Sequence, residues 1–492
     1  MSDRNINAKR KACVLIAAIA LAAVIIWLPG AEEGTAEGDP VVLSAQAKNL
    51  AAVFAVTLIL WATEAIPIAA TALLALALQP LLGVVELRTA ITNFMGPVFI
   101  FVVAMFIIAG VVIHVGLDRR FALLLLSRAG TDSRRVLLAF MVGTALLSSI
   151  MSDVPACAVF MALGLGVLGR MRAQPGESRF GKALMLGIPI AALIGGVASP
   201  AGSSVNVLGL DQLHDFAAAN NLDIHVSFLQ WMGLGVPMVL ILLPVAWWVL
   251  IRCYPPEVET IGAAEEIFAE RAALGPLSAA EIKVMAILST MMALWIAGSW
   301  VPWLDVSLVA LLGAIVVFLP GVGLIDWPTA QRAIGWDTLL MIGGVTTLGK
   351  ASMDTGLAKW FVVSCLSGVQ DWDPLWLVAA VSAFTVVVHL PLPIAPVVNA
   401  VLIPPVAELA LDPQTGQMLM NPALLALPVA FTASCAMLLP LDAVPLLTYS
   451  KGYYRMGDML LPGSIISLVW VIVMTLLMVY WAPALGLVGA AG

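Results

Sequence analysis

Long apolar runs separated by short polar turns recur along the whole chain. A helix that crosses a bilayer needs about 20 mostly apolar residues. Runs of that kind fall at 12–28, 50–82, 94–115, 228–251, 284–303 and 465–481. No part resembles a soluble domain, and the longest polar stretch, 252–283, is predicted to be a linker. The pattern therefore predicts an all-α membrane protein.

The charges in the loops orient the predicted helices. Basic residues precede the first run and gather again in two loops, 119–135 and 170–182. The positive-inside rule places all three in the cytoplasm. The loop after the first run is acidic and fits the outside, with Glu32, Glu33, Glu37 and Asp39. We therefore expect a multi-pass protein of the cell inner membrane, with its N-terminus in the cytoplasm and its C-terminus outside.

The segment between the two basic loops, 136–169, leaves the cytoplasm and has to return to it. It has about 34 residues, whereas two full crossings with a turn need about 40 or more. The length favours a re-entrant hairpin over two crossings.

Glycine, proline and serine interrupt two later apolar stretches, at 195–204 and at 439–445. Broken helices at corresponding places in two halves indicate the substrate site of a transporter. The order of hairpin and broken helix is the same in both halves, 136–169 then 182–213, and 374–411 then 422–450. This order predicts an N-terminal helix at 1–30, a first repeat at 45–252, a linker at 253–283 and a second repeat at 284–485.

Composition supports a membrane protein and argues against an enzyme. Of the 492 residues, 62% are hydrophobic and 11% are charged, whereas soluble domains have roughly 25% charged residues. The chain lacks H-E-x-x-H, G-x-S-x-G and nucleotide-loop motifs, and its four histidines are too scattered to suggest a metal site. The net charge of −7 lies in short loops of both signs and does not indicate a nucleic-acid partner.

Several motifs along the chain resemble the divalent-anion/sodium symporter family, which includes sodium-coupled dicarboxylate, citrate and sulfate carriers. Residues 61–67 read W-A-T-E-A-I-P, residues 116–120 read G-L-D-R-R, and residues 227–231, 274–278, 336–337 and 355–358 follow in the order of the family. The resemblance implies an inverted-repeat homodimer with about eleven transmembrane helices and two re-entrant hairpins. It also implies an elevator motion, in which a transport domain slides past a scaffold domain.

The resemblance also implies where the site lies, at two hairpin tips that carry Ser-Asn-Thr and at two helix breaks. The first tip corresponds to Ser152-Asp153-Val154, with Ser148 one turn earlier, and the first break to 202–206, which ends at Asn206. The second tip corresponds to Ile394-Ala395-Pro396 and keeps none of the three side chains. The second break corresponds to 442–446 and keeps one proline, Pro445.

Asp153 is the most informative residue, because a carboxylate in a membrane segment costs about 2.5–3.5 kcal/mol on insertion scales. Three roles remain open. It could bind sodium beside Ser148, Ser152 and the Gly202 backbone, since hard cations prefer oxygen ligands. It could carry a proton, or it could cap the second helix of the hairpin.

The other candidates also have two interpretations each. Asp442 could bind a cation or cap a helix, and His389 could carry charge or a proton, or pack as a core group. Asn206, Ser203 and Ser204 could bind an anion at a half-helix N-terminus or satisfy the broken backbone. Glu64 is expected to cap a tight turn.

The sequence therefore predicts a secondary transporter that couples a small anion, such as a dicarboxylate or sulfate, to sodium or protons. An anion exchanger without sodium coupling is the alternative, and an intramembrane enzyme or a channel is the alternative from another class. No cofactor is expected apart from sodium as the coupling ion. The predicted substrate contacts are Ser152, Asp153, Ser203, Ser204, Asn206, Pro445 and His389, and the predicted cation contacts are Ser148, Ser152, Asp153, Gly202 and Asp442.

Overall fold

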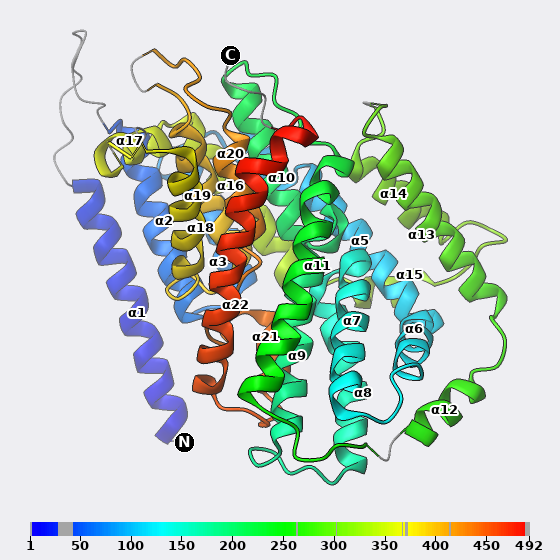
Figure 1. Ribbon diagram of the computed structural model, residues 1–492. Helices are drawn as coiled ribbons and strands as arrows, with labels where there is room; N and C mark the ends of the chain where they lie inside the picture. Colours follow the sequence, from blue (N-terminus) through cyan, green and yellow to red (C-terminus); the bar gives the residue numbers. More distant parts are fainter. Residues whose placement is uncertain are drawn as a thin grey trace.

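A computed structural model describes residues 2–27, 43–261, 264–301, 303–366, 368–369, 372–412 and 415–487 (Figure 1). These residues form helices and no β-strand. Eight of the helices are long and apolar enough to cross a membrane. The predicted all-α membrane protein is thereby confirmed, while the acidic loop after the first run lies outside the described residues.

The first half begins with helices that follow one another through short turns. They are α1 (Ser2–Trp27), α2 (Ala45–Thr63), α3 (Ile68–Leu81), α4 (Leu87–Phe94), α5 (Pro97–Val115) and α6 (Leu117–Leu126). The predicted hairpin follows as α7 (Ser133–Met151) and α8 (Asp153–Arg170). The predicted broken helix is α9 (Arg179–Gly196), a short turn η1 (Pro200–Gly202) and α10 (Ser204–Ala219). The half ends with α11 (Phe228–Cys253).

The second half repeats this order after the linker, which contains α12 (Ala264–Ala273). Its first helices are α13 (Ala279–Ala297), α14 (Val306–Val316), α15 (Trp327–Ala333), α16 (Trp336–Asp354) and α17 (Leu357–Cys365). The second hairpin is α18 (Pro374–Val388) and α19 (Ala395–Glu408), and the second broken helix is α20 (Ala423–Thr432) and α21 (Ala443–Tyr449). The chain continues through α22 (Met456–Leu476), η2 (Leu477–Trp481) and η3 (Ala482–Leu485).

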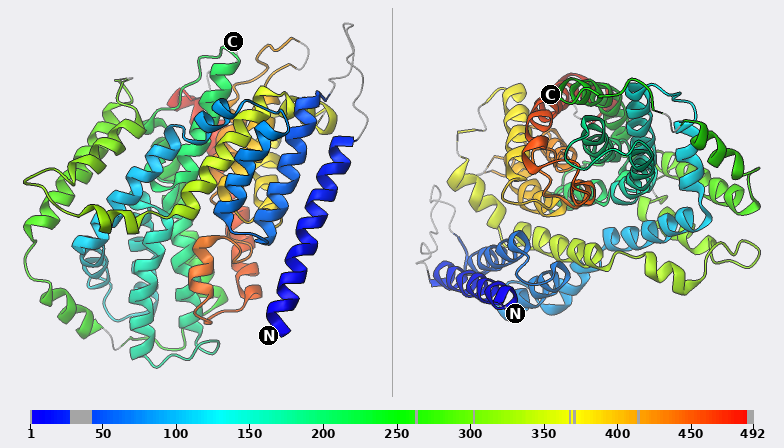
Figure 2. Two further views of the ribbon diagram at one scale, coloured as in Figure 1. Left: turned by 180° about the vertical axis from the view of Figure 1, so that it is seen from behind. Right: turned by 90° about the horizontal axis from the view of Figure 1, so that it is seen from below.

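The helices form two groups that lie side by side (Figure 2). One group, which we call the bundle, contains α7–α11 and α18–α22, which pack on one another. The other, which we call the row, contains α2–α5 and α13–α16 and extends along one flank of the bundle. The hairpins and the broken helices all belong to the bundle.

The two hairpins enter the bundle from opposite ends (Figure 1). The turn between α7 and α8 reaches the middle from the side where the N-terminus lies, and the turn between α18 and α19 reaches it from the side of the C-terminus. The first turn is tight because Ser152 adopts a left-handed φ of 86°. The second is longer and contains Pro391 and Pro393, which cannot continue a helix.

Small residues let the first hairpin approach the first broken helix closely. A Cβ atom added at Gly195 of α9 would lie 2.3 Å from the carbonyl oxygen of Ala145 on α7. Such small-residue contacts replace the hydrophobic driving force that helices lack inside lipid. Gly195 therefore sets the spacing between α7 and α9.

The linker contacts α6 and the first hairpin at the end of the molecule where the N-terminus lies. Glu270 of α12 accepts hydrogen bonds from Arg119 of α6 at 3.3 Å and from Arg170 of α8 at 2.6 Å. The bond from Arg170, followed by that from Arg119, lowers the pKa of the Glu270 carboxyl. Arg120 pairs with Glu281 at the start of α13. Glu270 thus joins α6 to the first hairpin, and the pair of Arg120 and Glu281 joins α6 to α13.

We expect the substitution Gly195→Ala to destabilise the protein, because the added methyl group has no space against the α7 backbone. Overpacking of this kind costs about 1–3 kcal/mol. Gly166→Ala on α8 is the matched control, since a Cβ atom there meets nothing within 4 Å. Thermal unfolding in detergent should show a lower Tm for Gly195→Ala and an unchanged or higher Tm for Gly166→Ala. Equal Tm values for the two variants would contradict the close packing.

Candidate functional site

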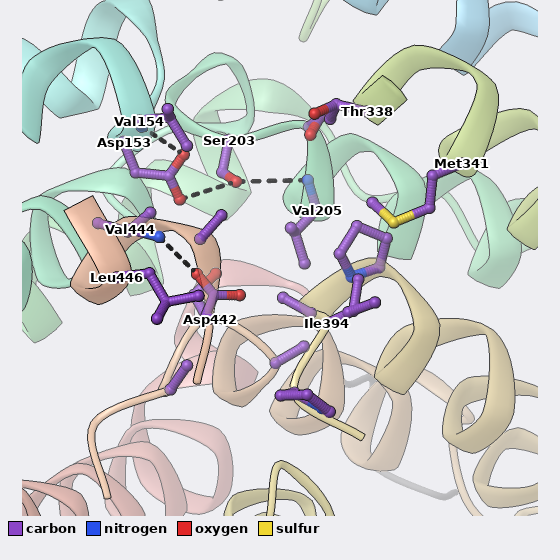
Figure 3. Close-up of a pocket in the computed structure, with 18 of the residues that line it drawn as sticks. Asp153, Val154, Ser203, Val205, Thr338, Met341, Ile394, Asp442, Val444 and Leu446 are labelled. Carbon is purple, nitrogen blue, oxygen red and sulfur yellow. Dashed lines mark hydrogen bonds between the residues drawn. The ribbon is translucent and has the colours of Figure 1, made fainter. Parts of the chain in front are cut away.

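The hairpin turns and the helix breaks meet around one cavity in the middle of the molecule (Figure 3). The first half contributes 153–154 and 203–205, and the second half contributes 393–396 and residues between 433 and 446. The row closes the cavity with Glu64, Ile68, Asp337, Thr338 and Met341. The cavity therefore lies between the bundle and the row, and both halves of the chain line it.

Asp153 projects into this cavity from the first residue of α8. One carboxylate oxygen accepts hydrogen bonds from the Ser152 hydroxyl at 3.0 Å and from the Val154 amide at 3.1 Å. The other accepts from the Ser203 hydroxyl at 3.5 Å (Figure 3). The N-cap residue of α8 is Ser152, so Asp153 bonds only its neighbouring amide rather than capping in the usual way. The hydroxyl contacts join the first tip to the first break.

Ser148, Gly196 and Gly202 bring three backbone segments together behind Asp153. The Ser148 hydroxyl is buried and donates to the Ala192 carbonyl at 2.7 Å. A Cβ atom at Gly202 would lie 2.4 Å from the carbonyl oxygen of Gly196 and 3.2 Å from that of Ser148. Carbonyl, hydroxyl and carboxylate oxygens are thus concentrated here, and oxygen is the ligand that hard cations require.

Ser203 and Ser204 begin α10 and line the cavity. The Ser203 hydroxyl caps the helix by accepting from the Val205 amide at 3.4 Å. Because a helix N-terminus carries partial positive charge, this edge of the cavity is suited to an anionic group.

Asn206 stabilises the unwound backbone and does not line the cavity. It is fully buried, and its side-chain amide donates to the carbonyls of Gly196 at 2.8 Å and Ser199 at 2.9 Å. The Val197 carbonyl is satisfied by the indole of Trp231 at 2.9 Å. The amide nitrogen of Asn206 therefore satisfies the broken backbone, while its buried Oδ1 has no partner among the described residues, and the substrate contact stays a prediction.

In the second half, Asp442 is the N-cap of α21 and accepts from the Val444 amide at 3.0 Å. Its carboxylate lines the cavity together with Ile394, Ala395 and Pro396 (Figure 3). Pro445 is buried and is not itself part of the lining, although its neighbours Val444 and Leu446 are. Asp442 therefore caps a helix and faces the same cavity as Asp153.

His389 is not brought to the cavity. It lies at the C-terminal end of α18, is 5% exposed, and is absent from the cavity lining. Neither ring nitrogen has a hydrogen-bond partner among the described residues. His389 therefore lies outside the lining, and a role for it in transport stays a prediction.

Five polar residues in or near the cavity were not predicted as contacts, and two of them, Asp337 and Thr338 of α16, line it from the row. Ser434 lines the cavity, and its buried hydroxyl has no partner among the described residues. Glu64 ends α2 in a left-handed turn, as the expected capping residue does, but it also lines the cavity. Asn399 of α19 donates to the Val205 carbonyl of α10 at 2.8 Å and links the two halves. Ser434 precedes the Pro440 break, which is the one sequence signal that could have identified it.

We expect Asn206→Ala to weaken the fold, because the Gly196 and Ser199 carbonyls then lose their donor. Each buried group left unsatisfied costs about 1–3 kcal/mol. Asn220→Ala removes an exposed amide from the end of the same helix and serves as the control. Thermal unfolding in detergent should separate the two variants clearly. A Tm of Asn206→Ala that equals the control would show that the amide does not support the break.

Comparison with known proteins gives the family. The pattern described as the sodium:sulfate symporter transmembrane region matches residues 9–488. The sodium-dependent dicarboxylate transporter SdcS of Staphylococcus saprophyticus is 27% identical over 448 residues, covering 86% of this chain and 84% of that protein. The sodium-dependent high-affinity dicarboxylate transporter 3 of Caenorhabditis elegans is 26% identical over 452 residues, covering 83% and 78%.

Solved structures show the same fold at lower identity. MtrF of Neisseria gonorrhoeae, described as one of a class of antimetabolite efflux pumps, has a TM-score of 0.57 at 11% identity, with 96% of this chain and 94% of that chain covered. The YdaH transporter of Alcanivorax borkumensis has a TM-score of 0.51 at 14% identity, with 96% and 98% covered. Since the family pattern spans nearly the whole chain, this protein belongs to the sodium:sulfate symporter family and is a membrane transporter, not an enzyme.

Proposed function

We propose that this protein takes up a small anion together with a cation, sodium or a proton, by an elevator mechanism. The observation that carries the proposal is the convergence of two hairpin turns and two helix breaks, from both halves of the chain, on one cavity. The relatives named as sodium-dependent dicarboxylate transporters support coupling to sodium and an acidic substrate.

The cation binds at the first tip in this proposal. Asp153 supplies a carboxylate, Ser148 and Ser152 supply hydroxyl oxygens, and the Gly202 segment supplies backbone oxygen. A sodium ion there would neutralise Asp153 and remove its repulsion of an anionic substrate. A proton on Asp153 would have the same electrostatic effect, so sodium and a proton are both candidates for the coupling ion.

The acidic group of the substrate binds at the start of α10. Ser203 and Ser204 offer hydroxyl groups, and the helix N-terminus offers a favourable potential. The Ser203 hydroxyl also donates a hydrogen bond to Asp153. Ser203 therefore lies between the proposed cation site and the proposed anion site. This shared contact couples occupancy of the two sites.

The bundle is the moving part of the proposed elevator, and the row is the scaffold. The cavity is suited to this because one wall belongs to the row and the rest to the bundle. We include in the proposal the two hairpins as re-entrant segments, about eleven transmembrane helices, and the repeat boundaries 45–252 and 284–485. We also include a homodimer in the inner membrane, with the N-terminus in the cytoplasm and the C-terminus outside.

Anion exchange without a coupled cation is the second candidate that the sequence left open. Exchange alone would leave a bare carboxylate at the entrance to an anion site. The position of Asp153 therefore favours symport.

We expect Asp153→Asn to weaken sodium coupling or replace it with another coupling ion, because the change removes the charge and keeps the shape. Asp223→Asn alters an exposed carboxylate outside the site and should behave like the wild type. Uptake into proteoliposomes should be measured under separate sodium and pH gradients, with a panel of dicarboxylates and sulfate. We expect at least a tenfold loss of sodium-driven uptake in Asp153→Asn.

The outcome that contradicts the cation role is an Asp153→Ala protein with wild-type uptake and unchanged ion dependence. Expression and size-exclusion profiles of both Asp153 variants should match the wild type, so that a folding defect is not mistaken for a coupling defect.

A further inference from the structure

A groove opens between α6, α8 and the linker helix α12, at the end of the molecule where the N-terminus lies (Figure 1). Arg119 of α6 and Arg170 of α8 line its charged end together with Glu270 of α12. The rest of the lining is largely apolar and includes Val159 and Leu163 of α8. The groove is therefore amphipathic, with a basic end and apolar walls.

Two guanidinium groups converge at the charged end. Arg119 donates to one carboxylate oxygen of Glu270 at 3.3 Å, and Arg170 donates to the other at 2.6 Å. A phosphate group accepts charge-assisted hydrogen bonds of the same kind, and arginine is favoured where phosphate is recognised. The side chain of Arg119 is 59% exposed, so a ligand from outside the protein can reach it. The two arginines can thus hold a phosphate in place of Glu270.

The apolar part of the groove has the length of one membrane leaflet. α8 runs from the hairpin turn in the middle of the molecule to the end where the groove lies (Figure 1). The helix rises about 16 Å from Val159 to Arg170, and half of the hydrocarbon core of a bilayer is about 15 Å thick. A Cβ atom added at Gly166, which also lines the groove, would meet nothing within 4 Å. The open space over Gly166 leaves a path for an acyl chain.

The charge around the groove favours an anionic ligand. The segment 117–135 contains five arginines and two aspartates, and the segment 169–182 contains four basic residues and one glutamate. The proposed topology places these segments at the cytoplasmic surface, where anionic lipids attract basic residues. Asp118 also lines the groove, but it is 7% exposed and lies in the first turn of α6, where the helix N-terminus stabilises its charge. The basic residues therefore outweigh Asp118.

We infer that the groove binds an anionic phospholipid, with its phosphate between Arg119 and Arg170 and one acyl chain along α8. Glu270 competes with the phosphate for the same two arginines, so a bound lipid releases Glu270 from α6 and from the first hairpin. The linker is acidic, with six glutamates and three basic residues in 252–283, which suits it to cover the basic end when no lipid is bound. This inference goes beyond the proposed function and shares with it only the orientation of the chain in the membrane.

Lipid binding to the purified protein in a neutral detergent tests the inference. Native mass spectrometry measures the affinity for dioleoyl phosphatidylglycerol, which is anionic, and for dioleoyl phosphatidylcholine, which has the same chains and no net charge. Glycerol 3-phosphate and inorganic phosphate are added as competitors, which distinguishes a lipid from a free phosphate. We expect phosphatidylglycerol to bind about tenfold more tightly than phosphatidylcholine, the scale of one hydrogen bond to a charged group. Neither soluble phosphate should displace it at equal concentration.

Substitutions in the groove then locate the lipid. Arg119→Gln and Arg170→Gln should each weaken phosphatidylglycerol binding about tenfold, because each removes charge-assisted hydrogen bonds to the phosphate. Arg128→Gln is the control, since Arg128 is exposed in the same basic loop and does not line the groove. Gly166→Phe keeps both arginines and fills the path of the acyl chain, so it should also weaken binding. Thermal unfolding of each variant shows whether it is folded, and Gly166→Phe tests the groove even if an arginine variant is unstable.

The variant Glu270→Gln tests the competition. It removes the carboxylate charge that holds the two arginines, and it should bind phosphatidylglycerol more tightly than the wild type does. Glu259→Gln is the control, because Glu259 is an exposed glutamate of the linker outside the groove. Equal affinities of Glu270→Gln and the wild type would overturn the competition.

The other outcomes are equally decisive. Equal binding of the two lipids, or equal affinities of Arg119→Gln and Arg128→Gln, would overturn the lipid site. Displacement of the lipid by inorganic phosphate would assign the arginines to a free anion instead, and unchanged binding by Gly166→Phe would contradict the path of the chain. No substrate is transported in these measurements. A failure here therefore leaves the proposed function standing, and a failure of ion-driven uptake leaves this inference standing.

Discussion

The architecture depends on keeping unwound backbone satisfied in the middle of a membrane protein. No water is available in the hydrocarbon region, so a broken helix survives only where side chains supply the missing partners. At the first break, Asn206 donates to two carbonyls and Trp231 to a third. The Ser199 hydroxyl adds a bond to the Ser149 carbonyl of α7 at 2.7 Å. These bonds hold the start of α10 beside the first hairpin tip. The candidate site depends on them.

The same constraint explains what the sequence could predict. Glycine and proline mark where helices end, so the helix ends around 152, 197–203, 389–394 and 433–442 follow from the sequence, while the re-entrant course of the hairpins and the side of each loop stay predictions. Asp153 stood out because a carboxylate inside an apolar run is costly. Ser434 and Asn399 did not stand out, because short polar residues are common in such runs. Their roles arise from contacts between halves, such as the bond from Asn399 to Val205, 194 residues apart in the chain. His389 was a candidate for its chemistry alone, and it is not among the residues that line the cavity.

The site combines two unequal halves. The first half contributes hydroxyls, a carboxylate and close backbone, which suit a cation and an acidic group. The second contributes an apolar turn and the carboxylate of Asp442. The same order of elements in the two halves therefore surrounds a site whose chemistry is not repeated. The proposed cation site accordingly lies in the first half.

The number of cations moved with each substrate tests this division of roles most directly. Reversal potentials of the wild-type protein in proteoliposomes, measured over a series of sodium, pH and substrate gradients, give this ratio without any substitution. We expect one coupled cation, sodium or a proton, for each substrate molecule. A ratio of two or more sodium ions for each substrate would contradict the division, because it would require a second metal site in the half whose hairpin tip has no side-chain oxygen.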